Sequence, residues 1–179
     1  GQAATDSAGL VASVLKPLLA HRHVLLLDQR GTGGSNALDC KGSAEAATPA
    51  DDSTFDAGKL RAAAAECLKQ LAGHADPRYY TTTVAAQDLE DVRQALGAPP
   101  LDLLGVSYGT RMAQQYLRRF PGAVRSVVLD SAVPNALALG EDFARNLDDA
   151  LKAQFARCTA EPACKKQFGD PDQTLYQLR

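Results

Sequence analysis

The feature that most constrains the fold is a change from strand to turn to helix around Ser107. Apolar residues dominate the segment from Leu101 to Val106, as in a strand buried within a parallel sheet. The sequence Gly105-Val-Ser-Tyr-Gly109 overlaps the end of this segment, and residues 111–120 have a helical pattern. The sequence therefore predicts that Ser107 lies on a tight turn between a strand and a helix, where a serine hydroxyl can act as a nucleophile.

The residues beside Ser107 suit that chemistry. Such a turn brings the positions two before and two after the serine against neighbouring backbone, so both must be small, as Gly105 and Gly109 are. The helix N-terminus favours developing negative charge at Ser107. The backbone N–H of Tyr108 is therefore predicted to stabilise a tetrahedral oxyanion. The alternative is an ordinary glycine-rich turn, which the flanking strand and helix disfavour.

Predicted strands and helices alternate along the first three quarters of the chain. Strands are predicted at Val24–Leu27, Leu101–Val106 and Ser126–Asp130, and helices at 7–18, 56–71, 82–96 and 111–120. Residues 36–56 are rich in Ala, Ser, Asp and Gly and are predicted to form a surface excursion. The alternation predicts an α/β fold with a parallel central sheet and helices on both faces.

Two further segments bear on the organisation of the chain. The glycine-rich stretch Arg30–Ser35 follows a predicted strand, but it has neither a Lys-Ser/Thr pair nor a complete G-x-G-x-x-G. A tight turn is therefore favoured over a phosphate-binding loop. From about Leu137 no further strand is predicted and residues 139–156 are amphipathic and helical. We therefore expect one domain over residues 1–136 and the beginning of another over 137–179.

Several of these segments together carry a resemblance to a known family. They are Val24–Ser35, Asp88–Gly97, Gly105–Gly109, Val127–Asp130 and Ala132–Pro134. As a set they resemble the corresponding segments of proline iminopeptidases and tripeptidyl aminopeptidases, which are serine peptidases of the α/β-hydrolase superfamily. The resemblance covers most of the chain up to about Pro134.

The resemblance implies a fold and an activity. It implies a partial α/β-hydrolase core over residues 1–136 that lacks some core strands, and the beginning of a helical cap over 137–179. It implies acyl transfer through Ser107 that releases residues from peptides with a free N-terminus. Members of this group carry a His-Gly-Gly-Pro-Gly type oxyanion loop, so the second oxyanion donor is expected at Gly1 or just before it. No metal and no cofactor is expected.

The four cysteines bear on the cellular compartment. Pairing of nearest neighbours gives Cys40 with Cys67 and Cys158 with Cys164, and each bridge would contribute about 2 to 4 kcal/mol in the chain-entropy model. Composition alone leaves four free thiols in a cytosolic protein equally open. Secreted members of the family similarly carry a cysteine pair in the cap. The resemblance thus implies two disulfides and a secreted or periplasmic bacterial protein.

The partners of Ser107 are harder to place. The triad of this superfamily runs Ser, then Asp or Glu, then His, and no histidine follows Ser107. His21, His23 and His74 precede it and are predicted to be ordinary surface residues. Asp130 ends the next predicted strand and is a minor candidate for the acid. The acid and the base are therefore expected from a second chain or segment, and this chain alone should be nearly inert.

Other features narrow the range of partners. The formal net charge of -2 disfavours nucleic acid, and no apolar run approaches the roughly 20 residues of a membrane span. Four acidic residues could bind the amine of a peptide, but a solvated helix face explains them more simply. They are Glu141, Asp142, Asp148 and Asp149. Two other functions stay open, namely hydrolysis of carboxylic esters and ligand binding without catalysis.

Overall fold

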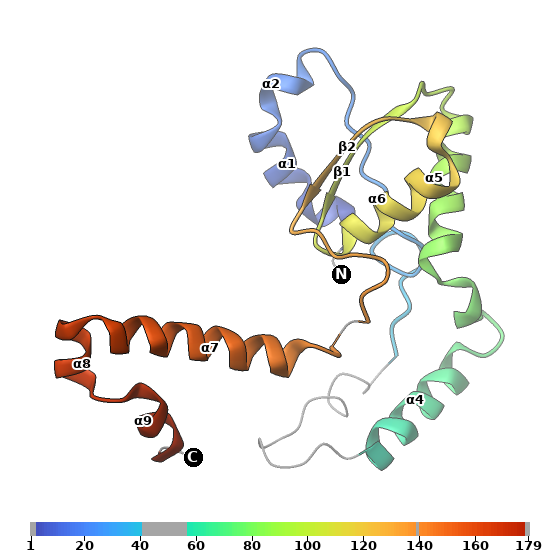
Figure 1. Ribbon diagram of the computed structural model, residues 1–179. Coiled ribbons are helices and arrows are strands. Elements are labelled where there is room, and N and C mark those ends of the chain that lie inside the picture. The colour runs from blue at the N-terminus through green and yellow to red at the C-terminus, as the bar shows by residue number, and fades with distance from the viewer. Residues whose placement is uncertain (1–2, 41–56, 139, 178–179) are drawn as a thin grey trace. The chain divides into compact units, whose positions relative to one another are not determined.

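The computed structural model describes residues 3–40, 57–138 and 140–177 (Figure 1). The chain divides into two compact units, Gly1–Asn135 and Ala136–Arg179. The first unit contains the sheet and the candidate site, and the second is helical in its described part.

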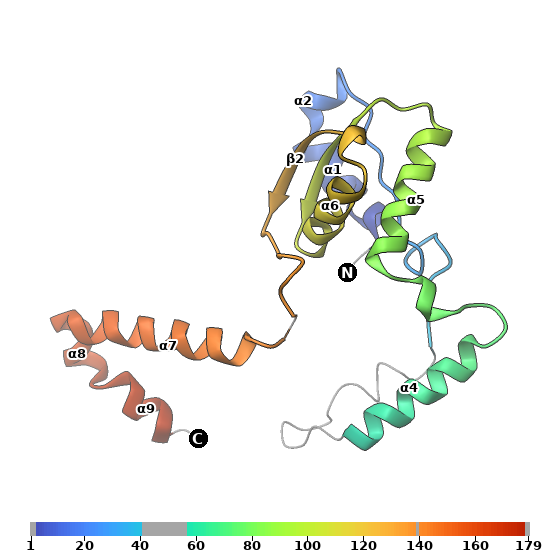
Figure 2. The same ribbon diagram turned by 45° about the vertical axis from the view of Figure 1, so that its right-hand side comes forward.

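In the described residues, the sheet of the first unit has two parallel strands, β1 (Leu101–Val106) and β2 (Val124–Asp130). The helix α6 (Tyr108–Arg119) and the 3-10 turn η3 (Pro121–Ala123) connect them. In the register Leu103 lies opposite Val127 and Val106 opposite Asp130. Strands are thus confirmed at residues 101–106 and 126–130, and the architecture is the predicted partial α/β fold (Figure 2). Their predicted burial on both faces is not found in the described structure, because Leu104, Val106 and Val128 are 53%, 54% and 58% exposed.

The strand predicted at Val24–Leu27 is wrong for the described structure. Residues 22–29 are assigned to no strand, and Val24 and Leu25 remain 38% and 43% exposed. An apolar run reports a tendency to be buried, whereas a strand also requires a neighbour that completes its backbone hydrogen bonds. In the described part of the chain no strand pairs with this segment.

The hydrophobic core of the first unit lies where α6 contacts α5 and the two strands. Helix α5 (Thr82–Ala95) packs on α6, and α6 packs on both strands (Figure 2). The buried residues of its hydrophobic cluster are Ala86, Tyr116 and Ala123, and partly buried apolar side chains surround them. The predicted helix at 82–96 is confirmed, although Thr81 is its N-cap and accepts a hydrogen bond from the Val84 N–H at 3.4 Å.

The predicted helix at residues 7–18 is present but interrupted. It forms the 3-10 turn η1 (Ala4–Ser7), then α1 (Ala8–Val14) and α2 (Lys16–Leu19), with Pro17 in the first turn of α2. Proline lacks the N–H that a continuous helix would need, which accounts for the break at this point. The side chains of Leu10, Val14 and Leu18 are 68%, 65% and 52% exposed.

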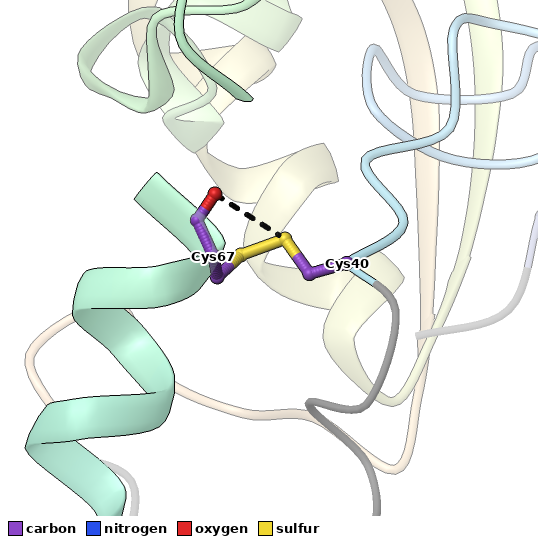
Figure 3. The surroundings of a disulfide bond; sticks show 2 residues. All are labelled: Cys40 and Cys67. Carbon is purple, nitrogen blue, oxygen red and sulfur yellow. Dashed lines mark hydrogen bonds between the residues drawn. A yellow bond between two sulfur atoms is a disulfide. The ribbon is translucent and has the colours of Figure 1, made fainter. Parts of the chain in front are cut away.

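A disulfide connects Cys40, five residues after the glycine-rich stretch, to a helix. Helix α4 (Ala57–Leu71) confirms the helix predicted at residues 56–71, and a 3-10 turn, η2 (Pro77–Tyr79), lies between α4 and α5. Cys67 of α4 is bonded to Cys40, with 5.3 Å between their Cα atoms (Figure 3). Most of the predicted excursion, residues 41–56, lies outside the described residues.

The second unit contains three helices in its described part. They are α7 (Phe143–Ala160), α8 (Pro162–Phe168) and α9 (Pro171–Gln177). Helix α7 begins later and ends later than the predicted helix at residues 139–156. A disulfide between Cys158 and Cys164, with Cα atoms 5.2 Å apart, joins α7 to α8. Among the described residues, no helix of either unit has the length and apolar character to cross a membrane.

Candidate functional site

Ser107 occupies the turn between β1 and α6, as the sequence predicts. Its φ of 52° and ψ of −118° place a non-glycine residue in a sparsely populated backbone region. Such strain persists only where the surrounding structure imposes it, and it is concentrated at functional sites. Ser107 is the N-cap of α6 and is exposed. Its hydroxyl makes no capping hydrogen bond.

The two glycines of the motif are not equivalent. A Cβ atom at Gly105 would lie 2.5 Å from the carbonyl oxygen of Gly109 and 2.9 Å from the Cα of Thr110. The turn therefore requires glycine at position 105, as predicted. A Cβ at Gly109 would meet nothing within 4 Å. The prediction that close backbone also requires a small residue at 109 is therefore wrong for the described structure, because the crowding falls on one side of the turn only.

The backbone of Ser107 is hydrogen-bonded at both ends. Its N–H donates to the carbonyl oxygen of Asp130 at 3.0 Å, which extends the pairing of β1 with β2 by one residue. Its carbonyl oxygen accepts from the N–H of Thr110 at 3.0 Å and from the Thr110 Oγ1 at 2.6 Å. The Thr110 hydroxyl in turn accepts a hydrogen bond from the N–H of Val133 at 2.8 Å. Hydrogen bonds thus connect the strained turn both to β2 and to the segment that follows β2.

The side chain of Tyr108 is held by two other segments. Its hydroxyl lies 2.7 Å from the Thr82 Oγ1, at the beginning of α5. It also accepts a hydrogen bond from the Gln29 Nε2 at 3.3 Å. Tyr108 is partly buried. The backbone N–H of Tyr108, the predicted oxyanion donor, therefore belongs to a residue whose side chain is fixed at its far end.

Gln29 belongs to a segment, residues 28–34, that connects several parts of the first unit. Residues 30–36 form turns, as predicted for the glycine-rich stretch. The buried carboxylate of Asp28 accepts hydrogen bonds from the Thr5 N–H and hydroxyl, at 2.8 to 2.9 Å, and from the Gly34 N–H at 2.9 Å. These bonds, chiefly that of the Thr5 N–H, lower the pKa of Asp28 below its ordinary value.

Close packing around Asp28 explains a glycine in this segment. Gly33 has a φ of +46°, and a Cβ atom there would lie 2.6 Å from the Cβ of Ala3 and collide with the Asp28 carboxylate. Residues 3–5 are therefore packed tightly against the turn. Gly1, the predicted second oxyanion donor, lies outside the described residues.

Arg30 connects the same segment to α5. Its guanidinium donates to both carboxylate oxygens of Asp88, with a distance of 2.6 Å from Nε to Oδ2. Its Nη1 donates to the carbonyl oxygen of Tyr79 at 3.1 Å. The hydrogen bond to Asp88 is the main cause that raises the pKa of Arg30. A bidentate pair of this kind sets an orientation as well as a contact.

The predicted partners of Ser107 are placed as follows. Asp130 lies beside Ser107 through the backbone bond, but its exposed side chain accepts only from the Ser131 hydroxyl, at 3.1 Å, among the described contacts. His21, His23 and His74 are exposed, and none of the three hydrogen-bonds to Ser107 in the part of the chain that the structure describes. The described residues therefore bring no base to Ser107.

Two of the acidic residues of the second unit form ion pairs with cationic residues of α7. Asp142 lies 3.2 Å from the Arg145 Nη1, and Asp148 lies 3.0 Å from the Lys152 Nζ. The pKa of Lys152 is raised, chiefly by its hydrogen bond to Asp148. Such spacings of three and four residues are typical of a solvated helix face, which was the simpler interpretation of these residues.

Two features of the first unit had no signal in the sequence pattern. One is Thr110, which is completely buried and connects the elbow, the turn at Gly105–Gly109, to Val133. The other is the buried carboxylate of Glu90 in α5, which accepts from Tyr116 Oη at 2.5 Å and from Arg93 at 2.7 and 2.9 Å. Glu90 reads as an ordinary polar helix residue in sequence. Only the packing of α5 on α6 shows that it is inside.

Comparison with known proteins agrees with this geometry. A family model described as the alpha/beta hydrolase fold matches residues 3–177, and the chain therefore belongs to the α/β-hydrolase fold family. Serine protease Hip1 of Mycobacterium tuberculosis is 40% identical over 86 residues, which are 46% of this chain and 16% of that protein. Tripeptidyl aminopeptidase of Streptomyces lividans is 37% identical over 114 residues, which are 59% of this chain and 21% of that protein.

These comparisons confirm the resemblance to serine peptidases of the α/β-hydrolase superfamily. They also set its extent, because the chain spans only 16% and 21% of the lengths of these two relatives.

Proposed function

We propose that the protein containing this chain is a serine hydrolase in which Ser107 is the nucleophile. The observation that carries the proposal is the backbone of Ser107, which is strained, exposed and held between β1 and α6. A non-glycine residue at φ 52° needs support from its surroundings, and Gly105, Thr110 and Asp130 supply it. That support places the hydroxyl at a helix N-terminus, where negative charge is favoured.

The chemistry is acyl transfer. Ser107 Oγ attacks a carbonyl carbon, its proton passes to a base from another segment or a second chain, and the backbone N–H of Tyr108 stabilises the oxyanion. The bond from the carbonyl carbon to the leaving group then breaks, and the leaving group takes up the proton. Water hydrolyses the acyl-enzyme and frees Ser107.

The proposed substrate is a peptide with a free N-terminus, from which the enzyme releases N-terminal residues. The matching relatives include a protein named a tripeptidyl aminopeptidase and another named a serine protease, which supports a peptide over an ester. The two disulfides support a secreted or periplasmic bacterial protein, because such bonds persist in oxidising compartments. The second unit is proposed to be the beginning of a helical cap.

A fluorophosphonate probe tests the nucleophile in the full-length protein. Ser107 Oγ forms a bond to phosphorus while the bond to fluorine breaks, and fluoride and the hydroxyl proton leave. We expect a single adduct, mapped to Ser107 by mass spectrometry, that is lost in Ser107→Ala. The matched control is Ser131→Ala, because Ser131 also has a positive φ, of 56°, and follows directly on β2.

The outcomes separate the candidate functions. No adduct on Ser107 in the unmodified protein would indicate a binding protein without catalysis and contradict the proposal. If the adduct forms, the rates on a tripeptide amide and on a short-chain ester identify the substrate class. Turnover of the ester without release of N-terminal residues would replace the peptidase by an ester hydrolase.

A further inference from the structure

The peptide unit that joins Ser107 to Tyr108 is anchored at its carbonyl oxygen. Thr110 donates two hydrogen bonds to this oxygen, one from its N–H at 3.0 Å and one from its Oγ1 at 2.6 Å. A trans peptide is planar, so its C=O and its N–H point in opposite directions. Holding the oxygen therefore also sets the direction of the Tyr108 N–H, and Thr110, which is completely buried, has little freedom to move.

The side chain of Tyr108 also restrains the orientation of this peptide unit. The hydroxyl of Tyr108 lies 2.7 Å from the Thr82 Oγ1 and 3.3 Å from the Gln29 Nε2. These partners come from α5 and from the turn segment at residues 28–34, which the Arg30–Asp88 pair joins to each other. Rotation of the Tyr108 backbone would pull the hydroxyl away from both partners. The orientation of the peptide is thus coupled to two segments outside the elbow.

We propose that Thr82, Gln29 and Thr110 are positioning residues that aim the Tyr108 N–H at the oxyanion. The inference rests on the proposed function, because it assigns roles around the same nucleophile. Stabilisation of an oxyanion depends on donors that are oriented before the reaction begins. A donor that is free to turn loses much of its effect, although the substrate binds as before. The positioning residues therefore act on the chemical step.

The test is the kinetics of fluorophosphonate labelling in the full-length protein, with three variants at adjacent positions of α5. Thr82→Val removes the hydroxyl that contacts Tyr108, Thr82→Ser retains it, and Thr83→Val is the matched control. Thr83 lies in the same helical turn, but its hydroxyl contacts Gln115 instead. We expect Thr82→Val to lower the maximal labelling rate about tenfold without a change in the half-saturating probe concentration, since misplaced groups commonly cost one to two orders of magnitude. Thr82→Ser and Thr83→Val should remain near the unmodified protein.

A second variant distinguishes loss of this contact from misfolding. Tyr108→Phe removes the hydroxyl at the other end of the contact and should also slow labelling about tenfold, with an unchanged circular dichroism spectrum. Equal rates for Thr82→Val, Tyr108→Phe and Thr83→Val, in a protein that is labelled on Ser107, would overturn the positioning role alone. A change only in the half-saturating concentration would assign Thr82 to binding and overturn it as well. An unmodified protein that is not labelled would overturn the proposed function and this inference with it.

Discussion

Glu90 offers a quantitative test of the packing between α5 and α6. The residue is 4% exposed, and its carboxylate accepts hydrogen bonds from Arg93, Tyr116 and Gln94. These bonds, that of Arg93 first, lower the pKa of Glu90 from 4.5 to about 2. A difference of about 2.5 pH units between the folded and unfolded states corresponds to about 3 kcal/mol of stability at neutral pH.

The sign of the pH dependence follows from the direction of this shift. Because the pKa of Glu90 is lower in the folded protein, its contribution to the free energy of unfolding is complete above about pH 5. The contribution falls as the pH approaches 2, and less than half of it remains at pH 3. Glu90→Gln, which removes the charge and keeps the size, should therefore destabilise the protein by about 3 kcal/mol at pH 7 and by less than half of that at pH 3.

Urea unfolding followed by circular dichroism at the two pH values measures these differences. The matched control is Glu66→Gln in α4, because Glu66 also pairs with a cation three residues later, Lys69, but in solvent. An exposed pair of this kind contributes about 0 to 1 kcal/mol. The reasoning is refuted if Glu90→Gln costs no more than Glu66→Gln at pH 7. A cost that does not shrink between pH 7 and pH 3 would equally contradict the assigned pKa.

Three further predictions concern the elbow, the Asp28 contacts and the disulfides. Gly105→Ala should abolish fluorophosphonate labelling, because the new Cβ collides with the backbone of α6, whereas Gly109→Ala should retain it; equal labelling of both would contradict the geometry. Asp28→Ala should speed amide hydrogen exchange in residues 3–14, because the contacts to Thr5 are lost, while exchange in α5 stays unchanged; unaltered exchange in residues 3–14 would argue against that role. Iodoacetamide should add nothing to the cysteines of this chain before reduction and four groups after it, as mass spectrometry would show; alkylation of the unreduced protein would count against the disulfides.

The local structure around Ser107 could be predicted because its determinants are contiguous. An apolar strand, a serine flanked by small residues and a helix follow one another within residues 101–120, and backbone sterics alone require glycine at position 105. Such short-range constraints can be recognised in a single sequence. The class of fold followed for the same reason, since the alternation of strand and helix patterns reports the layers of an α/β protein.

What tertiary structure decided depends on residues far apart in the chain. The pattern at Val24–Leu27 indicated burial but could not supply a strand partner, and no spacing shows that Gln29 reaches the hydroxyl of Tyr108, 79 residues away. Glu90 became a buried, strongly acidic group only when α6 packed over it. The sequence alone determined where the turn that carries Ser107 lies and why it forms. The packing of separate segments decided which side chains hold that turn, because hydrogen bonds between distant residues exist only once the chain has folded.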